Sequence, residues 1–201
     1  DILIATDPDC DRAGLAVRKD NQAVILNGNE VGILLLDYIC MMRKKKNIMP
    51  KCPVAVKTIV TTELATKIAE HYGVTVIDTL TGFKFIGDQI AILEEKGRED
   101  SFIFGFEESC GYLSGTYVRD KDAVNAAVLI ADMADYYNDK DIFLLDRLEE
   151  LYKKFGYLIS YLGNYEYPGT AGLSKMRSIM ENLRKSALLT KDYLNETDML
   201  H

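Results

Sequence analysis

Three aspartates at alternate positions, Asp7, Asp9 and Asp11, follow the apolar run 2–5 at the point where a strand would open into a loop. Like charges this close together repel one another by several kcal/mol in a partly buried loop unless a cation offsets them. Carboxylate oxygens suit a hard divalent cation such as Mg²⁺. The adjoining Arg12 would favour a phosphate group nearby. The pattern therefore predicts a cation site beside a phosphate.

Other kinds of acidic loop fit this spacing less well. An EF-hand loop that began at Asp7 would need Gly and Glu where the chain has Arg12 and Arg18, which excludes that calcium chemistry. A phosphatase of the haloacid dehalogenase type also places Asp-x-Asp after a strand, but it would have Thr or Val where Asp11 or Ala13 stands. A solvated acidic turn is the plain alternative, although a third Asp followed by Arg is unusual turn chemistry.

The size and charge of the chain limit the kinds of protein and partner that are compatible with it. Its 201 residues, 48% of them hydrophobic, are ample for the core of one large domain with parts of its neighbours. The net charge of −7 and the lack of a basic block beyond residues 43–46 argue against nucleic acid as a partner. The longest apolar stretch, residues 31–42, contains Asp37 and is too short to span a bilayer, so we expect no membrane partner.

The cysteines and the first residue bear on the origin of the chain. The four cysteines form no Cys-x-x-Cys pair, which favours reduced thiols and a cytoplasmic protein. The sequence opens inside a predicted strand and without an initiator Met. We therefore expect an internal piece of a longer protein.

Strand patterns alternate with helix patterns along the chain. Strands are predicted at residues 2–5, 15–17, 23–26, 53–60, 74–77 and 102–106, with a turn at 19–21. Helices are predicted from an Asn29 cap to Met42, from a Thr62 cap over 63–72, and at 84–95, 122–137, 142–155 and 173–188. This alternation predicts an α/β fold of three layers, with a mostly parallel sheet and helices on both faces.

Two loops that follow predicted strands carry side chains suited to a sugar. Ligands of open α/β sheets gather beyond the carboxyl ends of the strands, where this chain has residues 79–84 and 105–112. A carboxylate beside a hydroxyl, as in Glu107 and Ser109, can hold a vicinal diol, and Gly82 lets backbone approach a ligand. Each loop alone is weak evidence, because an acidic turn at a strand end explains it equally well.

Taken in order, three motifs are more specific. The order Asp7-Pro8-Asp9-Cys10-Asp11-Arg12, Thr81-Gly82-Phe83-Lys84 and Gly105-Phe106-Glu107-Glu108-Ser109 resembles the α-D-phosphohexomutase superfamily, and within it the bacterial α-phosphoglucomutase branch. The resemblance covers residues 1–155 and implies a parent of four domains. Residues 1–20 would end the metal-binding domain 2, residues 21–152 would form the sugar-binding α/β domain 3, and residues 153–201 would be a linker and the start of the phosphate-binding domain 4.

The resemblance also implies an activity and the residues that serve it. The parent would be a Mg²⁺-dependent isomerase that interconverts glucose 1-phosphate and glucose 6-phosphate through a phosphoserine enzyme and a bisphosphate intermediate. The remaining parts of domains 1, 2 and 4 would be its partners, and the phosphoserine would lie among them. The implied ligands of Mg²⁺ are Asp7, Asp9 and Asp11, the implied contacts to the hexose phosphate are Gly82, Lys84, Glu107 and Ser109, and the implied catalytic residues are Arg12 and Lys121.

Two expectations of geometry accompany these roles. The alternation of Glu107 and Ser109 would direct both side chains into the cleft, with Glu108 pointing away. The resemblance implies Lys121 or, as a second candidate, Lys84 as the acceptor of the proton of the attacking hydroxyl, and a lysine can serve only if its surroundings lower its pKa. A solvated charge in a turn is the alternative for Lys121.

Three alternatives of function stay open. The fragment lacks the phosphoserine, so we expect it to be inactive by itself, and it could be a non-catalytic sugar-phosphate-binding module. Sister activities, namely phosphomannomutase, phosphoglucosamine mutase and phosphopentomutase, remain because part of the substrate contacts would come from outside the chain. A Mg²⁺-dependent phosphatase with Asp7 as nucleophile is disfavoured by its motif.

Overall fold

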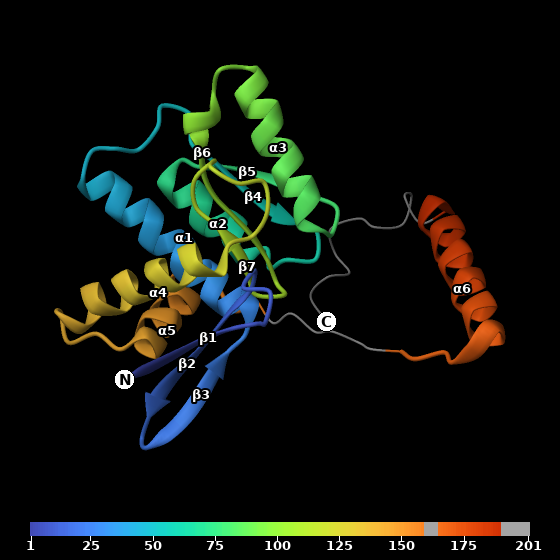
Figure 1. Ribbon diagram of the computed structural model, residues 1–201, viewed down its shortest axis with the longest axis horizontal. Helices are drawn as coiled ribbons and strands as arrows, with labels where there is room; N and C mark the ends of the chain where they lie inside the picture. Colours follow the sequence, from blue (N-terminus) through green and yellow to red (C-terminus); the bar gives the residue numbers. More distant parts are fainter. Residues whose placement is uncertain (159–164, 190–201) are drawn as a thin grey trace. The chain divides into compact units, whose positions relative to one another are not determined.

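The chain opens with a small antiparallel sheet, seen in blue in the computed structural model in Figure 1. Its three strands are β1 (Ile2–Thr6), β2 (Ala13–Lys19) and β3 (Gln22–Leu26). Asp20 and Asn21 form the turn between β2 and β3 with positive φ angles of 50° and 62°, a conformation that Asp and Asn tolerate better than most residues. The predicted turn at 19–21 is thereby confirmed.

A second sheet of four strands forms the centre of the fold, in the order β5-β4-β6-β7. Its strands are β4 (Val54–Thr58), β5 (Thr75–Thr79), β6 (Phe102–Glu107) and β7 (Gly111–Leu113). β4 is parallel to both of its neighbours, and β7 runs antiparallel to β6. Every residue of β4 and β6 is buried, as expected for strands that are covered on both faces.

Helices pack against both faces of this sheet. One hydrophobic core joins one face of the four-stranded sheet and the buried side of the small antiparallel sheet to four helices. These are α1 (Gly28–Lys45), α2 (Leu64–Tyr72), α4 (Ala123–Asn138) and α5 (Leu144–Phe155). A smaller core packs α3 (Phe83–Glu95) against the other face, where Phe83, Ile86 and Ile90 meet Val54 and Val56. A short 3-10 helix, η1 (Glu99–Ser101), leads into β6. This arrangement confirms the predicted three-layer α/β fold.

The start of α1 differs from the prediction. Asn27, not Asn29, caps the helix: its side chain accepts a hydrogen bond from the amide of Glu30 at 3.0 Å, and Glu30 accepts one from the amide of Asn27 at 2.8 Å. This reciprocal capping box needs Glu three residues after the cap, a spacing that Asn27 satisfies and Asn29 does not. Asn29 instead accepts a hydrogen bond from the amide of Thr62 at 3.0 Å.

The structure describes residues 1–158 and 165–189, which belong to two units, Asp1–Ser160 and Tyr161–His201. The first unit contains all the predicted site residues. The second contains α6 (Gly169–Leu189), which confirms the helix predicted at 173–188. Leu173, Met176, Met180 and Leu183 form an exposed apolar stripe along α6. Within the described ranges, no helix is both long enough and apolar enough to cross a membrane.

Candidate functional site

The connection between β1 and β2, residues 7–12, brings the three aspartates together. One carboxylate oxygen from each of Asp7, Asp9 and Asp11 lies within 4.8 Å of the other two. Asp7 Oδ1 accepts hydrogen bonds from the amides of Asp11 at 3.2 Å and of Arg12 at 3.0 Å. These bonds, chiefly the one from Arg12, lower the pKa of Asp7. The loop thus keeps Asp7 ionised.

Asp11 shows that the loop fits a cation. Its Oδ1 atom is buried and has no hydrogen-bond partner among the described residues, with Arg12 Nε 3.9 Å away. A buried carboxylate oxygen left in this state is costly unless a ligand satisfies it. Asp9 is exposed, and one of its carboxylate oxygens lies within 4.8 Å of a carboxylate oxygen of Asp11. An all-oxygen donor set with one unused buried oxygen fits a hard divalent ion such as Mg²⁺.

Backbone contacts hold this acidic loop against the turn between β6 and β7. Arg12 forms an isolated antiparallel bridge with Gly111. The amide of Ala13 donates to the carbonyl of Cys110 at 3.1 Å. The acidic loop also contacts α4, because the amide of Ala123, the first residue of that helix, donates to the carbonyl of Cys10 at 3.3 Å. The two loops that the sequence singled out, more than 90 residues apart along the chain, are therefore neighbours in space.

Glu107 stands at the end of β6 and contacts the loop after β5. It is 7% exposed, and its Oε1 atom accepts a hydrogen bond from the amide of Gly82 at 3.0 Å. Burial raises the pKa of Glu107, while the Gly82 bond acts in the opposite direction. Gly82 has a φ of 115°, which favours glycine at this position. The predicted substrate residues Glu107 and Gly82 are thus brought together.

The other predicted substrate residues stand apart from this contact. Ser109 is exposed, because β6 ends at Glu107 and the chain enters a turn, so strand alternation does not relate the two side chains. Lys84 is exposed in the first turn of α3, with its ammonium group 4.8 Å from the centre of the Phe85 ring. The side chain of Arg12 is 52% exposed.

Lys121 is paired with the acidic loop. Its Nζ atom lies 2.6 Å from Asp11 Oδ2 and 3.3 Å from Asp120 Oδ1, and its side chain is 13% exposed. Burial lowers the pKa of Lys121, but the bonds to these two carboxylates outweigh it and the net shift is upward. In this arrangement Lys121 is a cation, whereas a general base would need a lowered pKa.

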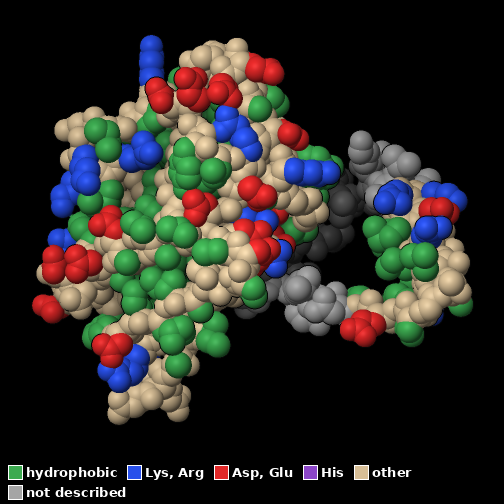
Figure 2. Space-filling view, in the orientation of Figure 1, with side chains coloured by type: hydrophobic (Ala, Val, Ile, Leu, Met, Phe, Trp, Pro, Cys, Tyr) green, Lys and Arg blue, Asp and Glu red, His purple; other side chains and the backbone are tan. Residues whose placement is uncertain are grey.

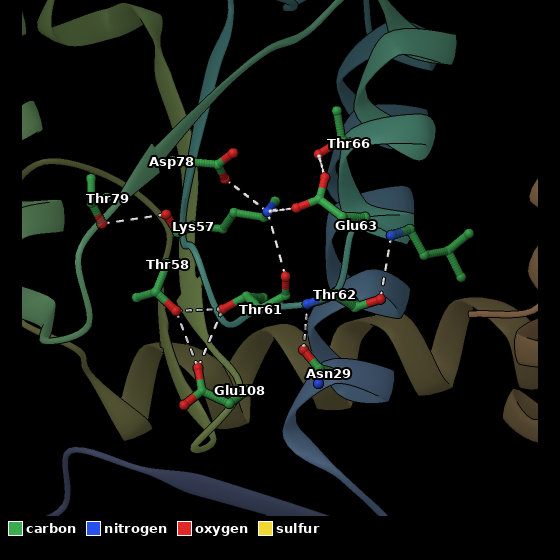
Figure 3. A network of polar contacts seen from close by, with 11 residues as sticks. Asn29, Lys57, Thr58, Thr61, Thr62, Glu63, Thr66, Asp78, Thr79 and Glu108 are labelled. Atoms are coloured by element: carbon green, nitrogen blue, oxygen red, sulfur yellow. Dashed lines mark hydrogen bonds and ion pairs between the residues drawn. The ribbon is translucent and has the colours of Figure 1, made fainter. Parts of the chain in front are cut away.

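The sequence did not single out a polar network behind these loops (Figure 3). Lys57, next to the last residue of the buried strand β4, is 1% exposed and pairs with Glu63 Oε1 at 2.8 Å and Asp78 Oδ1 at 2.7 Å. Nearby, Glu108 Oε2 lies 3.2 Å from Thr58 Oγ1 and 3.3 Å from Thr61 Oγ1. A charged residue inside a β-branched run was the available signal, since a buried lysine requires carboxylates close by.

A cavity of about 330 Å³ lies elsewhere, where the start of β1 and the end of β2 meet the connection between α4 and α5. Exposed apolar side chains such as Ile2 and Phe143 line it. Figure 2 shows hydrophobic side chains gathered over this part of the first unit. None of the predicted site residues belongs to the lining, so the cavity is separate from the acidic loop and from Glu107.

A family model described as phosphoglucomutase/phosphomannomutase, alpha/beta/alpha domain III, matches residues 27–155. Among curated proteins, the chain is 35% identical over 192 residues to the phosphoglucomutase of Staphylococcus saprophyticus and 37% identical over 187 residues to that of Staphylococcus aureus. These alignments cover 94% and 92% of this chain but 34% and 33% of the relatives. The chain thus spans about a third of the length of the curated relatives that it matches.

A solved structure with a similar fold is the open form of pp63/parafusin from Paramecium, described as an exocytosis-sensitive phosphoprotein and phosphoglucomutase. The superposition has a TM-score of 0.66 at 20% identity and covers 96% of this chain and 31% of that one. At this level of identity the likeness concerns the fold alone.

Proposed function

The chain belongs to the phosphoglucomutase/phosphomannomutase family, and on this premise we propose that it is the sugar-binding part of a Mg²⁺-dependent phosphohexomutase that interconverts glucose 1-phosphate and glucose 6-phosphate. The observation that carries the proposal is the contact between the two loops. The acidic loop, with its unused Asp11 oxygen, is bonded to the turn that follows Glu107. A cation and a sugar hydroxyl can therefore be held side by side.

The chain's own residues bind and orient the substrate in this proposal. Asp7, Asp9 and Asp11 hold Mg²⁺, which when bound neutralises negative charge on the phosphoryl group that moves. Arg12, half exposed at the end of the same loop, contacts a phosphate. Glu107 accepts a hydrogen bond from a sugar hydroxyl through the oxygen that Gly82 leaves free. The phosphoserine comes from a part of the protein outside this chain.

Three further residues complete the proposed site. Ser109 and Lys84, whose side chains are exposed, contact the hexose phosphate in this proposal. Lys121, as a charged ammonium, positions the acidic loop through Asp11. To accept the hydroxyl proton it must first leave this ion pair and release its own proton to solvent. We also propose that residues 1–20, 21–152 and 153–201 belong to domains 2, 3 and 4 of the parent, although residues 1–152 pack here as parts of one unit.

The proposal is tested by assaying the complete protein that carries this chain with glucose 1-phosphate. We expect turnover in the presence of Mg²⁺, and a loss of at least about 100-fold in kcat for Asp9→Asn, because a ligand to the cation is removed. Asp100→Asn is the matched control, since Asp100 is an exposed aspartate in η1. Unchanged turnover in Asp9→Asn would remove the assignment of the acidic loop to the metal.

The family description names two activities, so the preferred hexose is a separate question. We propose glucose, and comparison of kcat/KM for glucose 1-phosphate and mannose 1-phosphate decides it. A preference for the mannose substrate would support a sister mutase instead. The same assay with the 201-residue chain alone is expected to show no turnover, and calorimetry with glucose 6-phosphate and Mg²⁺ then measures whether the chain is a binding module.

We also propose a cytoplasmic location for the protein. All four cysteines, Cys10, Cys40, Cys52 and Cys110, carry free thiols. Free thiols support a reducing compartment.

A further inference from the structure

Glu108, between two residues of the proposed sugar site, is held by a pair of threonine hydroxyls. Its Oε2 atom lies 3.2 Å from Thr58 Oγ1 and 3.3 Å from Thr61 Oγ1, and the two hydroxyl oxygens lie 2.8 Å apart (Figure 3). Thr58 ends strand β4 and is fully buried, and Thr61, in the loop after β4, is 3% exposed. The carboxylate of Glu108 is thus directed toward the β4–α2 loop.

The number of protons limits how this triangle is bonded. Each threonine hydroxyl carries one proton, so two protons serve three close contacts. Either both hydroxyls donate to Glu108, or one donates to the other and the second donates to Glu108. In both cases the carboxylate accepts at least one hydrogen bond inside the protein. Hydrogen bonds to a charged acceptor are the stronger kind, so the contact restrains the Glu108 side chain.

Thr61 is itself held by a buried lysine. Lys57 Nζ donates to the carbonyl of Thr61 at 3.4 Å and pairs with Glu63 and Asp78 at 2.8 and 2.7 Å. These contacts tie the β4–α2 loop, which carries Thr61 and Glu63, to strands β4 and β5. Because Lys57 belongs to a central strand that is buried throughout, the loop has a rigid base.

The backbone on the other side of Glu108 is held as closely. A Cβ atom on Gly28, the first residue of α1, would lie 2.0 Å from the carbonyl oxygen of Glu108 and 2.7 Å from the amide nitrogen of Cys110. The hydroxyl of Tyr112 donates to the carbonyl of Gly28 at 3.2 Å. The turn 108–110 therefore lies between the N-terminus of α1 and the threonine pair. The Glu108 side chain is bonded to the threonines, and the backbone of the turn packs against α1.

We propose that Glu108 is a positioning residue: its bonds to Thr58 and Thr61 set the turn 108–110, and through it the placement of Glu107 and Ser109 on the sugar hydroxyls. The inference rests on the proposed function, because it concerns the same hexose phosphate. Glu108 touches no substrate. Its contribution is to discrimination between hexoses, since a sugar hydroxyl is recognised only by groups held at the correct place.

The test compares substrates in the complete protein. The variants are Glu108→Ala, the conservative Glu108→Gln, the double variant Thr58→Val/Thr61→Val, and the control Glu95→Ala, which removes an exposed carboxylate at the far end of α3. For each protein, kcat/KM is measured with glucose 1-phosphate and with its monodeoxy analogues. The reported quantity is the ratio of the two values for the analogue that wild type rejects most strongly. This ratio does not depend on the fraction of folded protein, so loss of stability alone cannot change it.

We expect the ratio to fall about 10-fold in Glu108→Ala and in the threonine double variant, because each removes a hydrogen bond that holds the turn. Glu108→Gln keeps an acceptor oxygen and is expected to stay within about 3-fold of wild type, as is the control. A ratio that is unchanged in Glu108→Ala while wild type is active would overturn the positioning role and leave the proposed function standing. A wild-type protein that turns over no hexose phosphate would overturn the proposed function and this inference with it.

Discussion

Replacing Arg147 by methionine tests whether a buried ion pair holds the helices on one face of the sheet together. Asp37, in α1, is 1% exposed, and its Oδ2 atom lies 2.7 Å from Nη2 and 3.2 Å from Nε of Arg147 in α5. Tyr72 of α2 donates to Oδ1 at 2.9 Å, and Tyr137 of α4 donates to Oδ2 at 3.4 Å. One carboxylate therefore joins four helices.

Arg147→Met leaves the Asp37 carboxylate buried with only the two tyrosine hydroxyls. Breaking a buried pair in this way costs about 3–5 kcal/mol of the free energy of unfolding. For a chain of this size, 1 kcal/mol corresponds to roughly 2–4 °C, so the melting temperature is expected to fall by about 6–20 °C. Circular dichroism during heating measures the change. Arg98→Met removes an exposed arginine and is the control, expected within about 0.5 kcal/mol of wild type.

The double variant Asp37→Ala/Arg147→Met separates the ion pair from general packing. If the pair is the cause, the double variant costs less than the sum of the two single variants by at least about 1 kcal/mol, because neither charge is left unpaired. Costs that simply add, or a fall of less than about 3 °C in Arg147→Met, would refute the reasoning.

Three further predictions concern the site. Because burial raises the pKa of Glu107, the folded state of wild type loses stability as the pH rises from the ordinary value of 4.5 through the raised one. Glu107→Gln carries no such charge, so in urea unfolding it should match wild type near pH 4 and exceed it at pH 7; equal midpoints at both pH values would contradict this. Mg²⁺ should raise the melting temperature of wild type, and Asp11→Asn should abolish most of that rise, whereas an undiminished response would show that Asp11 is not a ligand. Gly28→Ala should destabilise the chain by about 1–3 kcal/mol through the clash with Glu108, while Gly14→Ala, whose Cβ would meet Ala5 O at 3.9 Å, should not; similar melting curves for the two would refute the close contact.

Much of the fold follows from local sequence signals. The helix predicted at 84–95 spans Phe83–Glu95, and the helix predicted to end at residue 72 is closed by Gly73, a left-handed cap with φ of 75°. Both predictions succeed because periodicity and glycine conformation act within a few residues. The cap at Asn29 was wrong because two asparagines compete there and Glu30 selects Asn27. Strand β7 has three residues and starts with Gly111, so its structure depends on pairing with β6 rather than on any pattern of its own.

Some features of the site could likewise be predicted from local sequence signals, whereas others depend on contacts between distant parts of the chain. The aspartates of the acidic loop could be found from spacing, because they are neighbours in sequence and the loop that gathers them is local. The environment of Lys121 could not be predicted from spacing, because the nearest carboxylate belongs to Asp11, 110 residues earlier in the chain. The bond to Asp11 raises the pKa of Lys121. The direction of Glu108 depends on Thr58 and Thr61, which a strand pattern does not relate to it.

The bonding between the acidic loop and the β6–β7 turn also limits how the parent protein can move. The Arg12–Gly111 bridge and the bond from Ala13 to Cys110 would both have to break for the two loops to separate. The Lys121–Asp11 pair also ties the acidic loop to the segment between β7 and α4. A hinge between the small antiparallel sheet and the four-stranded sheet is therefore unfavourable. In the proposed mutase, an opening that admits a substrate must therefore bend the chain elsewhere and move both loops together as one rigid unit.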